Sequence, residues 1–129
     1  GDLFFDMEGD PFFGSDEVDG IDYLFGVIEP GRKGPDGGPT FHAYWSIEAG
    51  AVTPAAERRA FEAFIDFVMN RWSLDPNLHI YHYAPYETTA VKRLPARRGV
   101  RRPIPRRPAG DSGFSGELLD QAAGTLVQL

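Results

Sequence analysis

The chain has 129 residues and a formal net charge of −6, with 42% apolar and 13% aromatic residues. This length suffices for one domain with one hydrophobic core, and the composition is typical of a folded chain. There is no cysteine, which excludes a disulfide framework, a thiolate zinc site and a cysteine nucleophile. The apolar runs are shorter than the roughly 20 residues of a membrane span, and we expect a cytoplasmic protein.

The charge is unevenly distributed along the chain. Residues 1–91 carry 5 Lys/Arg and 16 Asp/Glu, a balance of −11, whereas residues 92–129 carry 8 and 3, a balance of +5. An acidic body with a basic tail is therefore expected. The sequence opens on Gly1 and enters a strand pattern almost at once, so we expect it to be a piece of a longer protein.

Three segments in the first 47 residues have the alternation and aromatic content of strands: Leu3–Glu8, Ile21–Glu29 and Thr40–Ile47. Residues 30–39 contain four Gly and three Pro and predict a hairpin connection. Three strands joined in this way predict an antiparallel meander.

A helical period follows. Thr53 is a suitable N-cap and Pro54 suits the first helical position. One apolar stripe then runs along about five turns, formed by Phe61, Phe64, Ile65, Val68 and Trp72. Residues 75–77 (Asp-Pro-Asn) predict its end.

A fourth strand is predicted at Leu78–Tyr83, and a second helix from Pro85 with Ala90, Val91 and Leu94 on its inner face. Right-handed connection through the first helix would place the fourth strand parallel to the first and beside it. The order β-β-β-α-β-α thus predicts an α/β fold of the ribonuclease H-like type.

Residues 95–129 change in character. Arg97 to Pro108 is rich in Arg and Pro and predicts an irregular segment, and Glu117–Leu129 predicts a short helix. We therefore divide the chain into a partial ribonuclease H-like domain (residues 1–94) and a basic tail (residues 95–129).

Asp6 and Glu8 are two residues apart on the first predicted strand, so they project from the same face, together with Phe4. Two adjacent carboxylates repel unless a cation neutralises them, and Mg²⁺ and Mn²⁺ prefer such oxygen ligands. The alternative is a solvated acidic strand end. Glu87 favours the metal interpretation, because it would begin the helix that follows the fourth strand, at the edge where open sheets place their sites. Its own alternative is a first-turn acid that the helix dipole stabilises.

Two segments resemble the ribonuclease H-like domain of the RecB-like nuclease family: residues 3–12 (LFFDMEGDPF) and residues 79–94 (HIYHYAPYETTAVKRL). Residues 23–27 and 61–67 also fit, so the resemblance covers Asp2 to Leu94. It implies a relative of the DEDD 3′–5′ exonucleases, with Asp6 and Glu8 as the first motif and Glu87 where the second motif usually has Asp. It also implies a longer chain with a RecB-like nuclease part and sometimes a helicase.

The resemblance stops after Leu94. A further strand and a last helix with the final metal-binding Asp should follow, yet neither Asp111 nor Asp120 fits that role. We therefore expect a domain that is incomplete at its C-terminus, through truncation or an out-of-frame ending, and a metal site that is one ligand short.

Three other groups of residues could have a functional role, but each also has a simpler interpretation. His79 and His82 are three residues apart on a strand and face opposite sides; His82 could approach the acidic pair, but a structural role is favoured. Tyr44, Trp45 and Trp72 could stack on bases, although their spacing favours the core. The Arg pairs from Arg97 to Arg107 could hold phosphates or belong to an incidental basic tail.

The sequence thus predicts a Mg²⁺- or Mn²⁺-dependent nuclease domain, exonuclease-like, acting on single-stranded DNA or RNA through Asp6, Glu8 and Glu87. With the fourth carboxylate missing, an inactive form of this domain is the alternative expectation. The alternative from another class is a non-catalytic module that binds nucleic acid or protein. A third interpretation is a scaffold on which the acidic pair is only surface charge.

Overall fold

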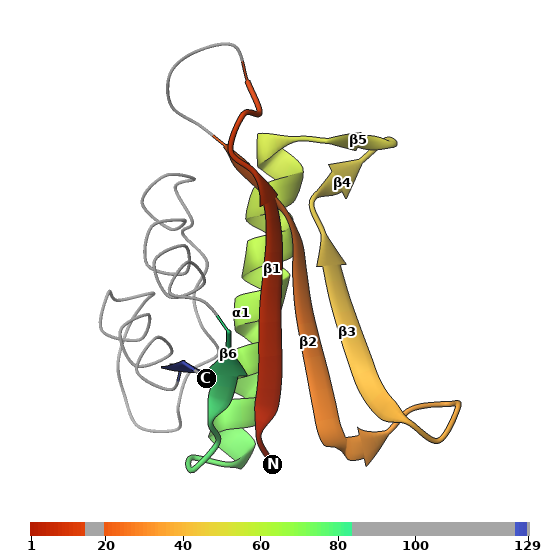
Figure 1. Cartoon of the computed structure of the whole chain (residues 1–129), viewed down its shortest axis with the longest axis vertical. Helices are drawn as coiled ribbons and strands as arrows, with labels where there is room; N and C mark the ends of the chain where they lie inside the picture. Colours follow the sequence, from red (N-terminus) through yellow and green to blue (C-terminus); the bar gives the residue numbers. More distant parts are fainter. Residues whose placement is uncertain (15–19, 84–125, 129) are drawn as a thin grey trace.

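A computed structural model describes residues 1–14, 20–83 and 126–128. It contains one mixed five-stranded sheet, a two-stranded hairpin and one long helix (Figure 1). The elements in chain order are β1 (Leu3–Asp10), β2 (Ile21–Lys33), β3 (Pro39–Trp45), β4 (Ile47–Glu48), β5 (Ala51–Val52), α1 (Pro54–Leu74), β6 (Ile80–His82) and β7 (Leu126–Gln128).

The sheet has the strand order β3-β2-β1-β6-β7. The β1–β2 and β2–β3 pairs are antiparallel, whereas β1–β6 and β6–β7 are parallel. The predicted meander is therefore confirmed, and so is the return of the chain through the helix to a strand parallel with β1. These observations establish a mixed α/β fold.

The helix α1 begins and ends as its sequence predicts. The Thr53 hydroxyl accepts a hydrogen bond from the Ala56 amide at 3.1 Å, and Pro54 occupies the first turn. At the other end, the Asp75 amide donates to the carbonyl of Arg71 at 3.0 Å. The helix covers one face of the sheet (Figure 1).

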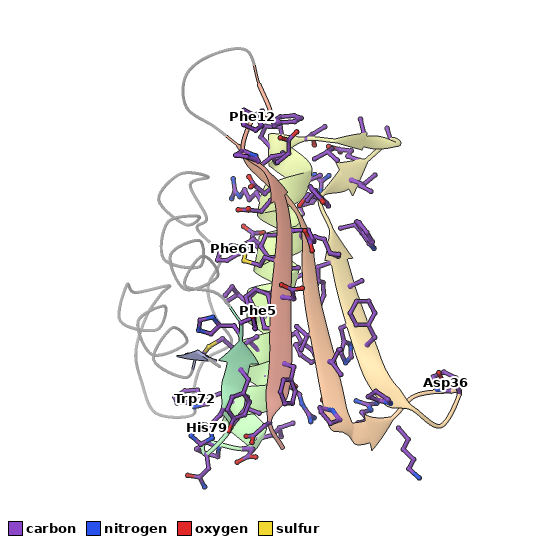
Figure 2. All side chains as sticks on the ribbon, viewed as in Figure 1. Phe5, Phe12, Asp36, Phe61, Trp72 and His79 are labelled. Carbon is purple, nitrogen blue, oxygen red and sulfur yellow. The ribbon has the colours of Figure 1, made fainter. Side chains whose placement is uncertain are left out.

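The core lies between that face and α1. Phe5 of β1 stacks on Phe64 of α1 with ring centroids 4.4 Å apart. Phe61 and Val68 of the predicted stripe are also buried, and Trp72 packs against the core from its margin. Figure 2 shows Phe5 and Phe61 along the helix-covered side, while Asp36 extends from the β2–β3 turn.

Four predicted element boundaries are wrong. Strand β1 continues past Glu8 to Asp10. Strand β2 continues to Lys33, and the turn is only residues 34–38, where the Gly34 amide donates to the Gly38 carbonyl at 2.7 Å and Gly37 has a φ of +81°. The third predicted strand is divided at Ser46: β3 ends at Trp45 and β4 begins at Ile47, and the buried Ser46 hydroxyl donates to the Asp22 carbonyl at the start of β2. The fourth strand is shorter than Leu78–Tyr83.

The end of the tail also differs from its prediction. Residues 126–128 form strand β7, paired in parallel with β6, and not the end of a helix over Glu117–Leu129. Helical spacing of Leu126 and Leu129 favoured a helix, but a three-residue strand needs only an available edge, which β6 provides. The helix predicted from Pro85 and the irregular Arg97–Pro108 segment lie outside the described residues.

Candidate metal centre on the open face

Asp6 and Glu8 lie on the face of β1 that points away from α1. Burial alternates along this strand: Leu3, Phe5 and Met7 are buried against the helix. Asp6 and Glu8 are exposed on the other face, together with Phe4. The shared face predicted for the two carboxylates is confirmed, and both are accessible to a solvent ion.

The two acids lie on a central strand of the sheet. Asp6 is opposite Gly26 of β2 and Glu8 is opposite Leu24, while β6 runs on the other side of β1. The register shifts directly after Glu8, between Glu8 and Gly9. Such an irregularity turns the strand locally, so it sets the direction in which the last residues of β1 project.

The carboxylates are available as ligands. Asp6 Oδ1 accepts a hydrogen bond from the Met7 amide at 3.0 Å. Within residues 1–14, 20–83 and 126–128, neither Asp6 nor Glu8 forms an ion pair with a basic side chain. A pair of hard oxygen donors without a neighbouring cation fits a divalent ion such as Mg²⁺ or Mn²⁺.

A third ligand is not supplied by the described part of the chain. In that part, no group of three or more His, Asp or Glu side chains is placed to hold a metal ion. Glu87, the third predicted ligand, lies outside the described residues. The chain reaches it soon after β6, the parallel neighbour of β1.

A shallow pocket of about 210 Å³ adjoins the acidic pair. Asp6 and Glu8 form its polar rim, and the remaining lining is apolar: Phe4, Phe5, Leu24, Gly26, Ile28 and Phe41. At Gly26, an added Cβ atom would meet the Phe41 ring at 3.4 Å. The absence of a side chain at this position therefore leaves more space in the pocket. The pocket can thus accept a flat, partly apolar group beside the two carboxylates.

We use the name open face for the exposed side of β1, β2 and β3, with Phe4, Asp6, Glu8, Leu24, Gly26, Ile28, Phe41, Ala43 and Trp45.

The core placement favoured for Trp45 is wrong, because its side chain is 52% exposed on this face. Tyr44 and Trp72 do pack against the core. The sequence reasoning missed Gly26 and Phe41, whose place beside Asp6 depends on strand register.

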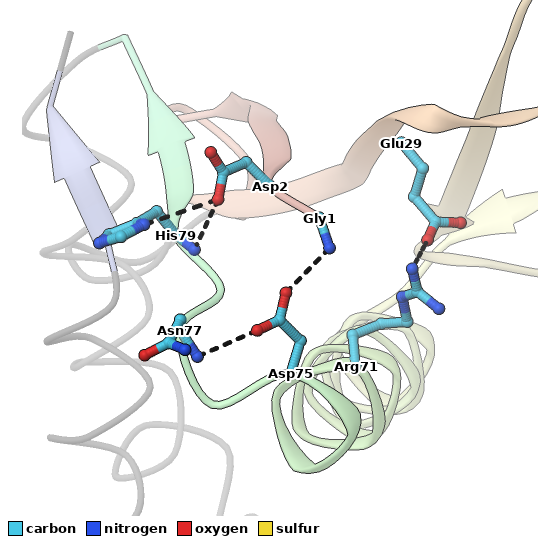
Figure 3. A network of polar contacts seen from close by, with 7 residues as sticks. All are labelled: Gly1, Asp2, Glu29, Arg71, Asp75, Asn77 and His79. Atoms are coloured by element: carbon cyan, nitrogen blue, oxygen red, sulfur yellow. Dashed lines mark hydrogen bonds and ion pairs between the residues drawn. The ribbon is translucent and has the colours of Figure 1, made fainter.

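The histidines are apart from the acidic pair. His82 pairs with Phe5 in the parallel ladder and is only 3% exposed, so it lies on the helix side of the sheet. This arrangement favours the structural role for His82. The His79 ring is 3.5 Å from Asp2 Oδ1, which also accepts the His79 amide (Figure 3).

A buried polar cluster fixes the end of α1 to the sheet. Glu29 of β2 is 2% exposed; its carboxylate meets Arg71 of α1 at 2.7 Å and the His42 ring of β3 at 2.6 Å (Figure 3 shows the arginine contact). Burial, and next the charge of Glu29, raise the pKa of the Tyr44 phenol. Sequence alone did not indicate this cluster, because its members come from three separate elements.

The N-terminal end is held at the same end of the helix. The Gly1 amino group lies 2.9 Å from Asp75 Oδ2, and the Asn77 amide donates to the other oxygen at 3.1 Å (Figure 3). The hydrogen bond from the amino group, followed by that from Asn77, lowers the pKa of the Asp75 carboxyl.

Two buried acids, Asp22 and Glu57, lie at the other end of α1. The Asp22 amide donates to Glu57 Oε1 at 2.8 Å, and both residues are buried. This bond ties the first turn of α1 to the start of β2. Together with the contact between Glu29 and Arg71, it joins both ends of the helix to β2, which is the sheet neighbour of β1.

No family model, curated protein or solved structure was found to match this chain. In the part of the chain that the structure describes, no helix is both long and apolar enough to cross a membrane.

Proposed function

We propose that the chain is a metal-dependent nuclease domain of the ribonuclease H-like type, acting on single-stranded DNA or RNA. The observation that carries this proposal is the pair Asp6 and Glu8, exposed side by side on a central strand next to a parallel strand. The strand order β3-β2-β1-β6-β7 supports the choice of fold, because the meander and the parallel strands occur in the order that this type requires.

Asp6 and Glu8 would hold Mg²⁺ or Mn²⁺, with Glu87 as the third ligand. When bound, the ion supplies Lewis-acid activation of water and of the scissile phosphate. The two carboxylates would orient the ion, and Glu8 lies directly before the register shift in β1.

The apolar pocket supports a single-stranded substrate. Phe4 and Phe41 expose ring surface within it, and an unpaired base can stack on an aromatic side chain whereas a base inside a duplex cannot. A terminal nucleotide could thus place its phosphate at Asp6 and Glu8 and its base toward β3. Removal of nucleotides from a 3′ end, as in an exonuclease, fits this arrangement.

Cleavage of end-labelled single-stranded oligonucleotides in Mn²⁺ or Mg²⁺ tests the proposal. Asp6→Asn, Glu8→Gln and Glu87→Gln should each reduce the rate by roughly 100-fold or more, because each removes a charged metal ligand. Asp36→Asn is the matched control, since Asp36 is an exposed acid in the β2–β3 turn, and it should cleave like the wild type.

Cleavage that survives Asp6→Asn would exclude the acidic pair as the centre. If the wild type binds the oligonucleotides without cleaving them in either metal, the chain is a binding module. The aromatic side chains of the open face are the observation that favours this second function.

A further inference from the structure

Strand β3 forms one edge of the sheet. It is the terminal strand in the order β3-β2-β1-β6-β7, and in the described residues it pairs only with β2. Its seven residues, PTFHAYW, contain no Asp, Glu, Lys or Arg. Edge strands usually carry charges or bulges that prevent further pairing, and between Thr40 and Trp45 the ladder with β2 has no register shift.

The backbone groups of β3 that point away from β2 can be assigned from the ladder. The Ser46 amide donates to the Tyr23 carbonyl of β2 at 3.0 Å. In an antiparallel pair this direction alternates from residue to residue, so Tyr44 and His42 also bond toward β2. The amides and carbonyls of Phe41, Ala43 and Trp45 therefore point outward from the sheet.

These same three residues have their side chains on the open face. Phe41 and Trp45 are 59% and 52% exposed, and Ala43 between them is also exposed. The edge is symmetric about Ala43, with one large aromatic residue two positions away on each side. A second copy running antiparallel, with Ala43 opposite Ala43, would place Phe41 opposite Trp45 twice.

This register would pair the outward-pointing backbone groups in hydrogen bonds and would also bring the aromatic side chains into contact. Three residues of each copy would exchange amide and carbonyl bonds, and the two Phe–Trp pairs are of the aromatic cross-strand type that stabilises antiparallel sheets. The small Ala43 side chains meet where the two strands are related by the two-fold axis. A sheet edge with a different spacing of aromatic residues would lack this match.

Charge and space also fit a second copy. The chain has a net charge of −6, whereas β3 itself carries no formal charge that would oppose the contact. The helix α1 contacts both β2 and β3, so the two α1 helices would be two to three strand spacings apart, roughly 10–14 Å. Because packed helices need only about 8–10 Å between axes, the two α1 helices could lie on the same side of the joined sheet.

We infer that the β3 edge binds a second copy of this chain in antiparallel orientation, centred on Ala43, to form one continuous sheet. The acidic pairs of the two copies then lie on one common open face. They are separated by five strand spacings, roughly 24 Å. This inference is independent of the nuclease proposal.

Sedimentation equilibrium of the full chain over a range of concentrations tests the inference. The wild type should reach twice the mass of one chain. Ala43→Lys places two like charges opposite each other and should raise the dissociation constant by about tenfold or more. Ala43→Pro should have the same effect, because it removes an amide that points outward and leaves the ladder with β2 intact.

Leu74→Lys is the control, because it makes the same charge change at an exposed apolar residue at the end of α1, and it should associate like the wild type. Circular dichroism melting identifies any variant that fails to fold, in which case the other Ala43 variant decides. A wild-type mass of one chain at every concentration would overturn the inference. The β3 edge would then not bind a second copy, and another protein would be the remaining candidate partner. Undiminished association of folded Ala43→Lys would also overturn it.

Discussion

Gly26 determines how much room there is beside the acidic pair. It lies opposite Asp6 on β2, and the Phe41 ring lies 3.4 Å from the position that a Cβ atom would take. The absence of a Cβ atom is therefore what keeps the pocket open between the two strands. No special backbone conformation is involved, because Gly26 is an ordinary strand residue.

Substitution of Gly26 separates access to the pocket from stability. Gly26→Leu should fill the pocket and slow cleavage of oligonucleotides by at least about tenfold, while retaining the metal ligands. Gly26→Ala should be neutral or stabilise the fold by up to about 1 kcal/mol, since the added Cβ atom would meet the Phe41 side chain at 3.4 Å, close to an ordinary van der Waals contact. Unfolding in denaturant and cleavage rates measure the two effects, and full activity of Gly26→Leu would contradict this use of the pocket.

The sequence predicted Asp6 and Glu8 because strand alternation is local: their shared face follows from a spacing of two. The pocket is different. Gly26 and Phe41 lie beside Asp6 only through the pairing of three strands, and register cannot be read from one strand alone. Trp45 was misplaced for a related reason, since aromatic content indicates a strand but does not say which face is buried.

At the scale of elements, α1 is held to the sheet by polar contacts as well as by its apolar stripe. The stripe is visible in sequence because 3.6-residue spacing is local. The buried Glu29, in contrast, depends on Arg71 and His42, which approach it only in the fold. The predicted end of the third strand was wrong at Ser46, where the side chain bonds to the distant residue Asp22.

The Glu29 cluster predicts a loss of stability in alkali. Burial and the charge of Glu29 raise the pKa of Tyr44 above its ordinary value near 10. A group whose pKa is raised by folding contributes stability that is complete below its unfolded pKa and is lost as pH rises through the folded one. The free energy of unfolding should therefore fall above about pH 10.

Tyr44→Phe should show a smaller loss of stability between pH 8 and pH 11 than the wild type, measured by denaturant unfolding. Tyr83→Phe is the control, because the Tyr83 side chain is exposed, and it should follow the wild type. Equal losses in the wild type and in Tyr44→Phe would show that folding does not disfavour ionisation of Tyr44.

At the scale of the whole molecule, the last described strand links the tail to the sheet. β7 pairs with β6 over residues 126–128, although composition and the end of the family resemblance separated residues 95–129 from the domain. A short strand beside an existing edge is hard to predict, since three residues carry no reliable period. The place of β6 beside β1 and parallel to it, however, followed correctly from the handedness of the crossover.

Removal of residues 126–129 tests the contribution of β7. The shortened chain should lose about 1–3 kcal/mol of unfolding free energy, because it loses the backbone hydrogen bonds between β7 and β6. Thermal and denaturant unfolding of the full and shortened chains provide the comparison. An unchanged stability would mean that β7 contributes nothing to the sheet.

The central claim is that Asp6 and Glu8 together bind a divalent metal ion. Calorimetric titration of the full chain with Mn²⁺ and Mg²⁺ tests it most directly, with Asp6→Asn, Glu8→Gln and the control Asp36→Asn beside the wild type. We predict saturable binding that raises the melting temperature of the wild type and of Asp36→Asn, and that is lost in the other two variants. Equal binding by the wild type, Asp6→Asn and Glu8→Gln, or no binding by any of the four proteins, would contradict it.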